Sequence, residues 1–383
     1  MYEEWVLKNS DLADKLNDLS YTLANRHEHL SHRSFKIVGA NDPPASRGRK
    51  ISGQPVSLVM VFTGQGAQWP RMGRELLLRD DLVFQKSIRA MDKHLAALSE
   101  PPQWTIEGEL QKSAKTSRVQ LAELSQPLCT AVQVAMVDLL SSIGIEPAAV
   151  VGHSSGERQA AKLQNRKGAM AAVGLGWNEV EPFLNRPRVV IACENSPSSV
   201  TLSGDAEEVQ ATLTRIKEAH PDITARLLKV EKTYHSYHMQ EIGSEYHAVI
   251  EPHLVGKQAS KPFFSSVTGT GLPEQRKLDA KYWQQNLESP VLFSPAAAGI
   301  LEHFKNPAFI EIGLHGALAG PARQIFAKVS ASPPYLSAMV RNEDCVQSYL
   351  TAVGKLFELN VRNLVFRGVV RATHSIVSLS AAS

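Results

Sequence analysis

A serine between two glycines, Ser154, offers the clearest chemistry in this sequence. It lies in the motif Gly152-His-Ser-Ser-Gly-Glu, directly after an apolar run at residues 148–151. A strand that turns sharply into a helix at such a motif exposes the serine hydroxyl, and glycines allow the close backbone approach that the turn needs. An exposed serine at a helix N-terminus can accept an acyl group. The structural alternative is a serine that only fits a tight turn.

A glycine-rich segment, Gly64-Gln-Gly-Ala-Gln, follows a second apolar run at residues 57–62. No Lys and Ser or Thr follow it at the spacing of a phosphate-binding loop, so phosphate binding is not expected. A turn whose backbone N–H groups face a reaction centre is the better interpretation. Together with the N–H of Ser155, it would make an oxyanion hole with two donors.

Two histidines are candidates for the base that takes the proton from Ser154. They are His235 and His238, in the segment Tyr234-His-Ser-Tyr-His-Met. A single histidine is more often structural than catalytic. This segment follows the last strand of an expected inserted unit, where the returning chain could face Ser154.

The elements expected around these residues alternate between strands and helices. The apolar runs 57–62 and 148–151 are typical of buried parallel strands, and a helix is expected at 127–140 with Pro127 in its first turn. Residues 168–232 follow the order β-α-β-β-α-β of a ferredoxin-like unit. Its strands are expected at 169–175, 189–193, 200–203 and 225–230, and its helices at 179–184 and 206–219.

The expected fold class is α/β: a hydrolase-like core with a parallel sheet plus an inserted ferredoxin-like subdomain, preceded by a small linker segment. The linker covers residues 1–54, with a helix and then a strand at 35–38. The core covers 55–166 and 233–345, and the subdomain covers 167–232. Residues 346–383 are assigned to a C-terminal helix and an irregular tail. The helix is expected at about residues 344–359, and the tail is expected to pack poorly.

Composition narrows the class of protein. The 383 residues are 43% hydrophobic and 21% charged, and the formal net charge of +3 is too small to imply a nucleic-acid surface. A membrane is not expected as a partner either. No apolar run approaches the ~18 residues of a membrane span. The three cysteines lack metal-ligand spacing and indicate a reducing compartment. No signal peptide is visible, so a cytoplasmic location is expected.

Several motifs together resemble one family, the malonyl/acyl-CoA:acyl-carrier-protein acyltransferases. The likeness is greatest to the acyltransferase domains of fungal type I polyketide synthases of the highly reducing kind, and it covers about residues 56–345. Residues 1–40 resemble the linker that precedes this domain. Besides the three segments above, the matching motifs are Ser125-Gln-Pro, Lys167-Gly-Ala-Met, Glu194-Asn-Ser-Pro, Tyr282-Trp-Gln-Gln-Asn-Leu-Glu-Ser-Pro-Val and Glu311-Ile-Gly.

The resemblance implies a Ser–His dyad. Ser154 would be the nucleophile, and His235 the general base, oriented by a backbone carbonyl from near 290–292 rather than by a carboxylate. His238 would be a supporting or surface residue. The backbone N–H groups of Gln65 and Ser155 would hold the oxyanion.

The resemblance also implies substrates and partners. Malonyl-CoA would acylate Ser154, and the phosphopantetheine thiol of an acyl carrier protein would then take the malonyl group, with no permanently bound cofactor or metal. A ketosynthase and other synthase domains would be its neighbours. The residues that would contact substrate are Arg158, Tyr234, Gln126 and Asn195. In the family, a bulky residue at the position of Tyr234 accompanies a preference for malonyl rather than methylmalonyl units.

The chain departs from the family directly after Glu157. On the order of twenty residues, about two average helices, are absent before Arg158-Gln-Ala-Ala-Lys, which resembles the segment of the carboxylate-binding Arg. Two alternatives therefore stay open beside the transferase. One is a catalytically impaired acyltransferase fragment, and the other is a serine hydrolase or thioesterase.

Overall fold

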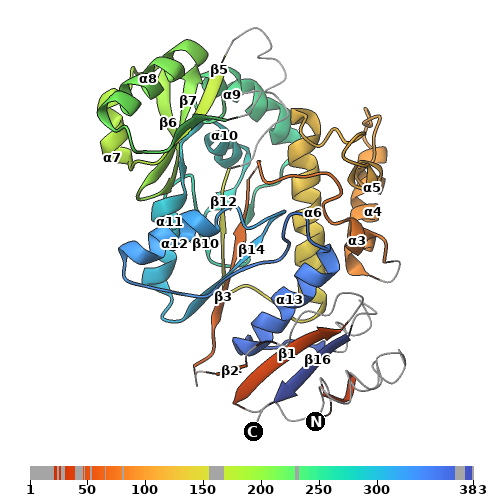
Figure 1. Cartoon of the computed structure of the whole chain (residues 1–383). Coiled ribbons are helices and arrows are strands. Elements are labelled where there is room, and N and C mark those ends of the chain that lie inside the picture. The colour runs from red at the N-terminus through yellow and green to blue at the C-terminus, as the bar shows by residue number, and fades with distance from the viewer. Residues whose placement is uncertain are drawn as a thin grey trace.

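The structure is a computed structural model in which two main sheets are flanked by helices (Figure 1). It describes residues 21–23, 26, 31–38, 46, 48–51, 54–64, 66–79, 82–154, 168–228, 233–366 and 376–381. The mixed α/β class expected from the sequence is confirmed. Within these ranges, no helix is long and apolar enough to cross a membrane.

A six-stranded sheet forms the centre of the molecule, in the order β11-β10-β4-β3-β14-β15. Neighbouring strands from β10 to β15 run parallel, and β11 pairs antiparallel at the edge. The two apolar runs predicted as parallel strands are therefore confirmed. The bounds are β3 (Ser57–Phe62), β4 (Ala149–Gly152), β10 (Phe263–Ser265), β11 (Thr270–Gly271), β14 (Pro307–Ile312) and β15 (Tyr335–Ser337).

Strand β3 contributes to a core on each face of this sheet, because successive side chains of a strand point to opposite faces. Leu58 and Met60 belong to the first core, whereas Val59 and Val61 belong to the second. All four side chains are buried. A strand covered on both faces must be apolar throughout, which is why residues 57–62 lack alternation.

Helices cover the two faces. The first core includes residues of α3 (Arg74–Leu77), α4 (Val83–Ala96), α5 (Ile106–Gln111), α6 (Ala122–Ser142) and α13 (Cys345–Glu358). The second includes residues of α9 (Tyr237–Ile250), α10 (Ala280–Glu288), α11 (Phe293–His303) and α12 (Ala319–Lys328). Helix α6 begins earlier than predicted, so Pro127 lies inside it rather than in its first turn.

A second, five-stranded sheet has the order β13-β6-β7-β5-β8. The chain passes through β5 (Gly168–Val173), α7 (Trp177–Val180), β6 (Val189–Ser196), β7 (Ser199–Asp205), α8 (Ala206–Ala219) and β8 (Ala225–Leu227), with a 3₁₀ turn (Glu181–Phe183) after α7. This is the predicted succession of elements. Strand β13 (Val291–Leu292) joins the sheet from the main unit, parallel to β6. Residues of β5 to β8 and α8 form a separate hydrophobic cluster.

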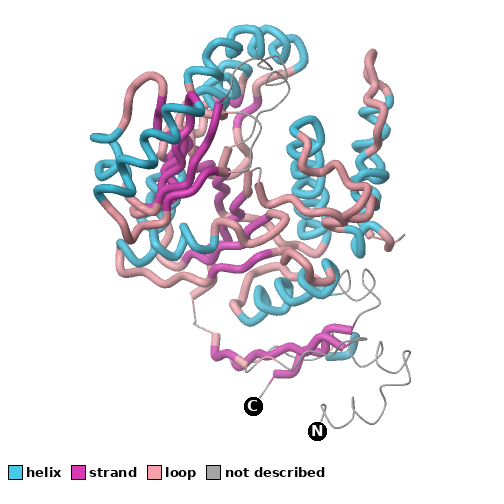
Figure 2. The backbone as a smooth tube through the Cα atoms, turned by 45° about the horizontal axis from the view of Figure 1, so that its top comes forward, coloured by secondary structure: helices cyan, strands magenta, loops and turns pink. Residues whose placement is uncertain are grey.

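A three-stranded sheet, in the order β16-β1-β2, lies below α13 in Figures 1 and 2. Strand β1 (His32–Val38) contains the predicted strand 35–38, and β2 comprises Arg49–Lys50. The prediction of an irregular tail is wrong over β16 (Ile376–Ala381), which pairs antiparallel with β1. This pairing joins residues more than 300 positions apart, so nothing local in the tail could reveal it. The predicted helix around Leu12 to Leu23 lies largely outside the described residues.

The smaller elements complete the described chain. Strands β9 (Lys257–Gln258) and β12 (Lys277–Leu278) pair antiparallel, and a second 3₁₀ turn (Glu251–His253) follows α9.

Glycine 354 allows β1 to pack on α13. A Cβ at this position would lie 2.3 Å from a ring carbon of Phe35, which is itself buried. We expect Gly354→Ala to lower the free energy of unfolding by roughly 1–3 kcal/mol, because the added methyl group overpacks the contact with Phe35. At an exposed helix position the same change would instead raise the free energy of unfolding, since alanine has the higher helix propensity. Urea unfolding followed by circular dichroism measures the change.

The control is Gly320→Ala in α12, where a Cβ meets nothing within 4 Å. It should be neutral or stabilising by up to about 1 kcal/mol. If both variants were equally stable, Phe35 would not pack against Gly354.

Candidate active site

Ser154 stands on a sharp turn at the carboxyl end of β4. Its φ of 53° lies in the left-handed region, which is uncommon for a residue with a Cβ. The N–H of the preceding His153 donates to the carbonyl of Phe62 at 2.9 Å, so the pairing of β4 with β3 extends up to the turn. The serine hydroxyl oxygen lies 2.6 Å from Nε2 of His235, 81 positions further along the chain.

His235 is buried, with 4% of its surface exposed, two residues before the start of α9. Its Nδ1 lies 2.9 Å from the carbonyl oxygen of Ser289. A carbonyl only accepts hydrogen bonds, so Nδ1 carries the proton and Nε2 presents its lone pair to the hydroxyl of Ser154. The orienting carbonyl was expected near residues 290–292, and the structure places it one position earlier. His238 faces Asp205 instead of Ser154, and it is buried rather than on the surface.

The electrostatic environment keeps His235 uncharged at neutral pH. Burial lowers its pKa to about 4, repulsion from His153 acts in the same direction, and hydrogen bonds at the backbone of Ser289 and Asn286 oppose both. Burial also lowers the pKa of His153. A neutral imidazole next to a serine hydroxyl is the state that a general base requires.

The glycine-rich loop after β3 packs directly against the turn that carries Ser154. A Cβ on Gly64 would lie 2.3 Å from the carbonyl oxygen of His153, so this approach requires glycine. The side chain of Gln68 accepts from the N–H of Gly66 at 2.7 Å, and the guanidinium of Arg341 donates to the carbonyl of Ala67 at 3.0 Å. These contacts hold the loop in one conformation beside Ser154. Gln65 and Ser155, the predicted oxyanion donors, lie outside the described residues.

A cavity of about 240 Å³ opens beside Ser154 and is lined by residues of α6 on one side and by residues of α10 and around β10 on the other. It is lined by Phe62, Thr63, Gly64, Gln126, Cys129, Thr130, Gln133, Gly152, His153, Ser154, Phe263, Ser266, Tyr282, Trp283 and Asn286. The ends of β3, β4 and β10 meet here, as expected where parallel strands present their carboxyl ends.

The four predicted substrate residues occupy different places. Gln126 lines the cavity. Asn195 binds His153 instead, with its Oδ1 2.8 Å from the imidazole Nε2. Tyr234 is buried in the second core and is not part of the cavity lining. Arg158 lies outside the described residues.

Sequence reasoning assigned no role to several residues that the structure brings to the site. Ser289 supplies the carbonyl at His235, and Tyr282, Trp283 and Asn286 line the cavity from α10. All four belong to the Tyr282-Trp-Gln-Gln-Asn-Leu-Glu-Ser-Pro motif, so its resemblance to the family was the available signal. In the described part of the chain, no group of three or more His, Cys, Asp or Glu side chains could hold a metal ion.

The fold places a serine hydroxyl and a histidine imidazole together at one cavity. A family model described as "Acyl transferase domain" matches residues 59–166 and 158–362. The chain therefore belongs to the acyl transferase domain family. The two matched segments overlap at residues 158–166, shortly after Ser154.

The curated relatives are fungal highly reducing polyketide synthases. The chain is 51% identical over 387 residues to "Highly reducing polyketide synthase sphB" of Aspergillus fumigatus, a match that covers 94% of this chain and 15% of the relative. It is 45% identical over 375 residues to "Highly reducing polyketide synthase FUM1" of Gibberella moniliformis, covering 89% of this chain and 14% of the relative. The chain thus spans about a seventh of the length of these relatives. The 387 aligned positions exceed the part of the chain aligned, so sphB has residues that this chain lacks.

Solved acyltransferase structures are similar to this chain in fold. A loading acyltransferase from the avermectin modular polyketide synthase is 29% identical, with a TM-score of 0.68 over 78% of this chain and 99% of that chain. The acyltransferase domain from the second module of the salinomycin polyketide synthase has a TM-score of 0.75 over 96% of this chain and 92% of that chain. At 23% identity it supports the fold alone.

The depressed pKa of His235 predicts the pH dependence of serine acylation. Protonated His235 cannot accept a proton from Ser154, so the acylation rate should fall with a midpoint near pH 4 and stay level from about pH 5 to 7. Single-turnover acylation followed by intact-protein mass spectrometry measures this profile, with circular dichroism at each pH to verify folding. A midpoint near the ordinary histidine pKa, about 6.5, would show that burial does not lower the pKa of His235.

Proposed function

We propose that this chain transfers a malonyl unit from CoA to the phosphopantetheine thiol of an acyl carrier protein, through an ester on Ser154. The contact that supports this most directly is the 2.6 Å pair of Ser154 and His235, with the imidazole oriented by the Ser289 carbonyl. That arrangement supplies a nucleophile and a base, and it does so without a carboxylate.

The first half-reaction consumes malonyl-CoA. Oγ of Ser154 attacks the thioester carbonyl carbon while Nε2 of His235 takes the hydroxyl proton. The tetrahedral intermediate collapses, the bond to sulfur breaks, and the CoA thiol leaves with the proton from His235. In the second half-reaction His235 takes the proton of the pantetheine thiol, whose sulfur attacks the malonyl ester, and Ser154 recovers its proton. Such covalent catalysis gives ping-pong kinetics.

The oxyanion of each intermediate would be held by the backbone N–H groups of Gln65 and Ser155. The loop on either side of Gln65 is fixed by the contacts of Gly64, Gln68 and Arg341, which supports a preorganised donor there. Each donor of this kind contributes about 3–4 kcal/mol to the stability of the transition state.

The malonyl carboxylate would pair with Arg158, because a guanidinium binds a carboxylate through two parallel hydrogen bonds. Gln126 would contact the acyl group from α6, since it lines the cavity. Tyr234 would affect the choice between malonyl and methylmalonyl units only indirectly, as a core residue next to His235. Asn195 would likewise act indirectly, through its hydrogen bond with His153.

The proposal also covers the two structural units and the partner domains. The unit around the six-stranded sheet would be hydrolase-like, and the five-stranded sheet with α7 and α8 would be a ferredoxin-like insertion. The relatives are long synthases, of which this chain spans about a seventh. A carrier protein and a ketosynthase are therefore its proposed partners.

Radiolabelled malonyl-CoA tests the function. Ser154→Ala should take up no label, and His235→Ala should load on the order of 10²–10⁴ times more slowly because the proton acceptor is lost. The control is His247→Ala on α9, a partly exposed residue whose Nδ1 lies 4.0 Å from a carboxylate oxygen of Glu251. It should load like the unaltered protein.

Adding a carrier protein separates the alternatives. Label that passes from Ser154 to the carrier supports the transferase, and release of malonate supports a hydrolase. A folded protein that takes up no label supports the impaired fragment, in which the shortened segment after Glu157 abolishes loading.

Arg158 is tested by substrate choice. Arg158→Lys should slow malonyl loading roughly tenfold, since one bidentate charged contact is replaced by a single point charge. Acetyl-CoA, which has no carboxylate, should load at an unchanged rate. The conservative control is Arg226→Lys on the exposed part of β8. An equal loss for both substrates would contradict the carboxylate-binding role.

A further inference from the structure

The five-stranded sheet contacts residues beside both members of the Ser154–His235 pair through hydrogen-bonded side chains. The two contacts start from Asn195 in β6 and from Asp205 at the end of β7. Neither side chain touches the cavity. Each binds a residue next to, or close after, one member of the pair.

The first contact reaches the nucleophile. Oδ1 of Asn195 accepts the Nε2–H of His153 at 2.8 Å, and the amide nitrogen of Asn195 donates to the hydroxyl of Thr201 at 3.0 Å. Thr201 is buried in the neighbouring strand β7, so the orientation of the amide is fixed from the sheet side. His153 is the residue immediately before Ser154, on the turn whose φ of 53° must be held by its surroundings.

The second contact reaches the base. Oδ1 of Asp205 accepts from the hydroxyl of Tyr237 at 2.5 Å and from Nε2 of His238 at 2.9 Å. These are the first two residues of α9, two and three positions after His235. His235 has a φ of 57°, also in the left-handed region. Burial raises the pKa of Asp205, but the hydrogen bonds from Tyr237 and His238 outweigh it and lower the pKa overall, as expected for a carboxylate that acts as acceptor.

We propose that Asn195 and Asp205 are positioning residues that set the distance between Ser154 and His235 from a common sheet. The two reacting residues lie on separate segments of the main unit, and both segments have strained backbone. A reacting pair must be held to within about 0.5 Å, and supporting side chains normally do this. Anchoring both segments to one rigid sheet meets that requirement. The inference deepens the proposed function, since it rests on Ser154 and His235 being the reacting pair.

A fluorophosphonate probe tests the proposal separately from malonyl transfer. The probe phosphonylates an activated serine and needs neither Arg158 nor a carrier protein. Asn195→Ala and Asp205→Ala should each lower the labelling rate constant of Ser154 on the order of tenfold, in line with the effect of small misplacements on reaction rates. Because both act on one distance, the double variant should lose clearly less than the product of the two single losses.

Rescue and kinetic readouts distinguish positioning from stability. Asp205→Asn keeps an oxygen acceptor for Tyr237 and His238, so it should retain most of the labelling rate that Asp205→Ala loses. With malonyl-CoA, the alanine variants should lower kcat and leave KM within about twofold, because neither side chain lines the cavity.

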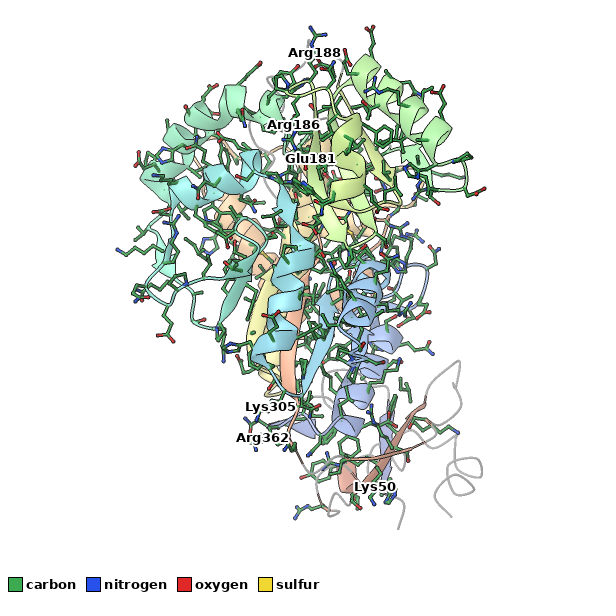
Figure 3. The ribbon with its side chains drawn as sticks, turned by 90° about the vertical axis from the view of Figure 1, so that its left-hand side faces the viewer. Lys50, Glu181, Arg186, Arg188, Lys305 and Arg362 are labelled. Carbon is green, nitrogen blue, oxygen red and sulfur yellow. The ribbon has the colours of Figure 1, made fainter. Side chains whose placement is uncertain are left out.

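Two control variants alter the same unit of the chain without touching either contact. Ser203→Ala removes a buried hydroxyl of β7 that has no hydrogen-bond partner among the described residues, two residues from Thr201 and from Asp205. Glu181→Ala removes an exposed carboxylate that pairs with Arg186 at 3.1 Å, in the 3₁₀ turn after α7 in the upper part of Figure 3. Both should label at the unaltered rate, and thermal unfolding of every variant shows that it is folded at the assay temperature.

The outcomes separate the two proposals. Labelling of Ser154 without malonyl transfer would contradict the proposed function and leave the positioning role supported by the alanine variants. Unchanged labelling in Asn195→Ala and Asp205→Ala, a full multiplicative loss in the double variant, or equal losses in Ser203→Ala would overturn the positioning role. An unaltered protein whose Ser154 does not react with the probe would overturn both.

Discussion

The hydrogen bond from Nδ1 of His235 to the carbonyl of Ser289 is the interaction on which the site depends. It fixes the tautomer, and the tautomer determines that Nε2 presents a lone pair to Ser154. The carbonyl of Ser289 can accept this hydrogen bond only because the end of α10 lies beside the start of α9. The two helices pack against each other. Because a carbonyl is uncharged, it does not hold the imidazole in its protonated form as a carboxylate would, and burial then lowers the pKa of His235 to about 4.

The central sheet determines where these groups meet. Parallel strands β3, β4 and β10 place their carboxyl ends at one edge, and the residues that follow them line the cavity next to Ser154. Strand β3 is buried on both faces, so its register against β4 and β14 cannot slip without exposing one of the two cores. The loop of Gly64 is thereby delivered to the turn of Ser154 at a distance that excludes any Cβ.

The five-stranded sheet gives this arrangement its second support. It contacts the main unit through β13 and through the side chains of Asn195 and Asp205, which lie at the ends of β6 and β7. A unit inserted in the sequence between Ser154 and His235 is therefore well placed to relate the two in space. Its fold explains why residues 81 positions apart can lie 2.6 Å from each other.

The sequence by itself determined the elements and the types of reacting residue. Continuous apolar runs defined β3 and β4, helical periodicity defined α8 and α13, and the glycines around Ser154 indicated the turn, because each of these signals is local. Tertiary structure decided the partners. The residue types left both His235 and His238 open as the base, and only the family resemblance favoured His235. The carbonyl of Ser289, the contact of Asn195 with His153 and the pairing of β16 with β1 all join distant residues. Such contacts depend on how the sheets and helices pack, and no local pattern of residue types encodes them.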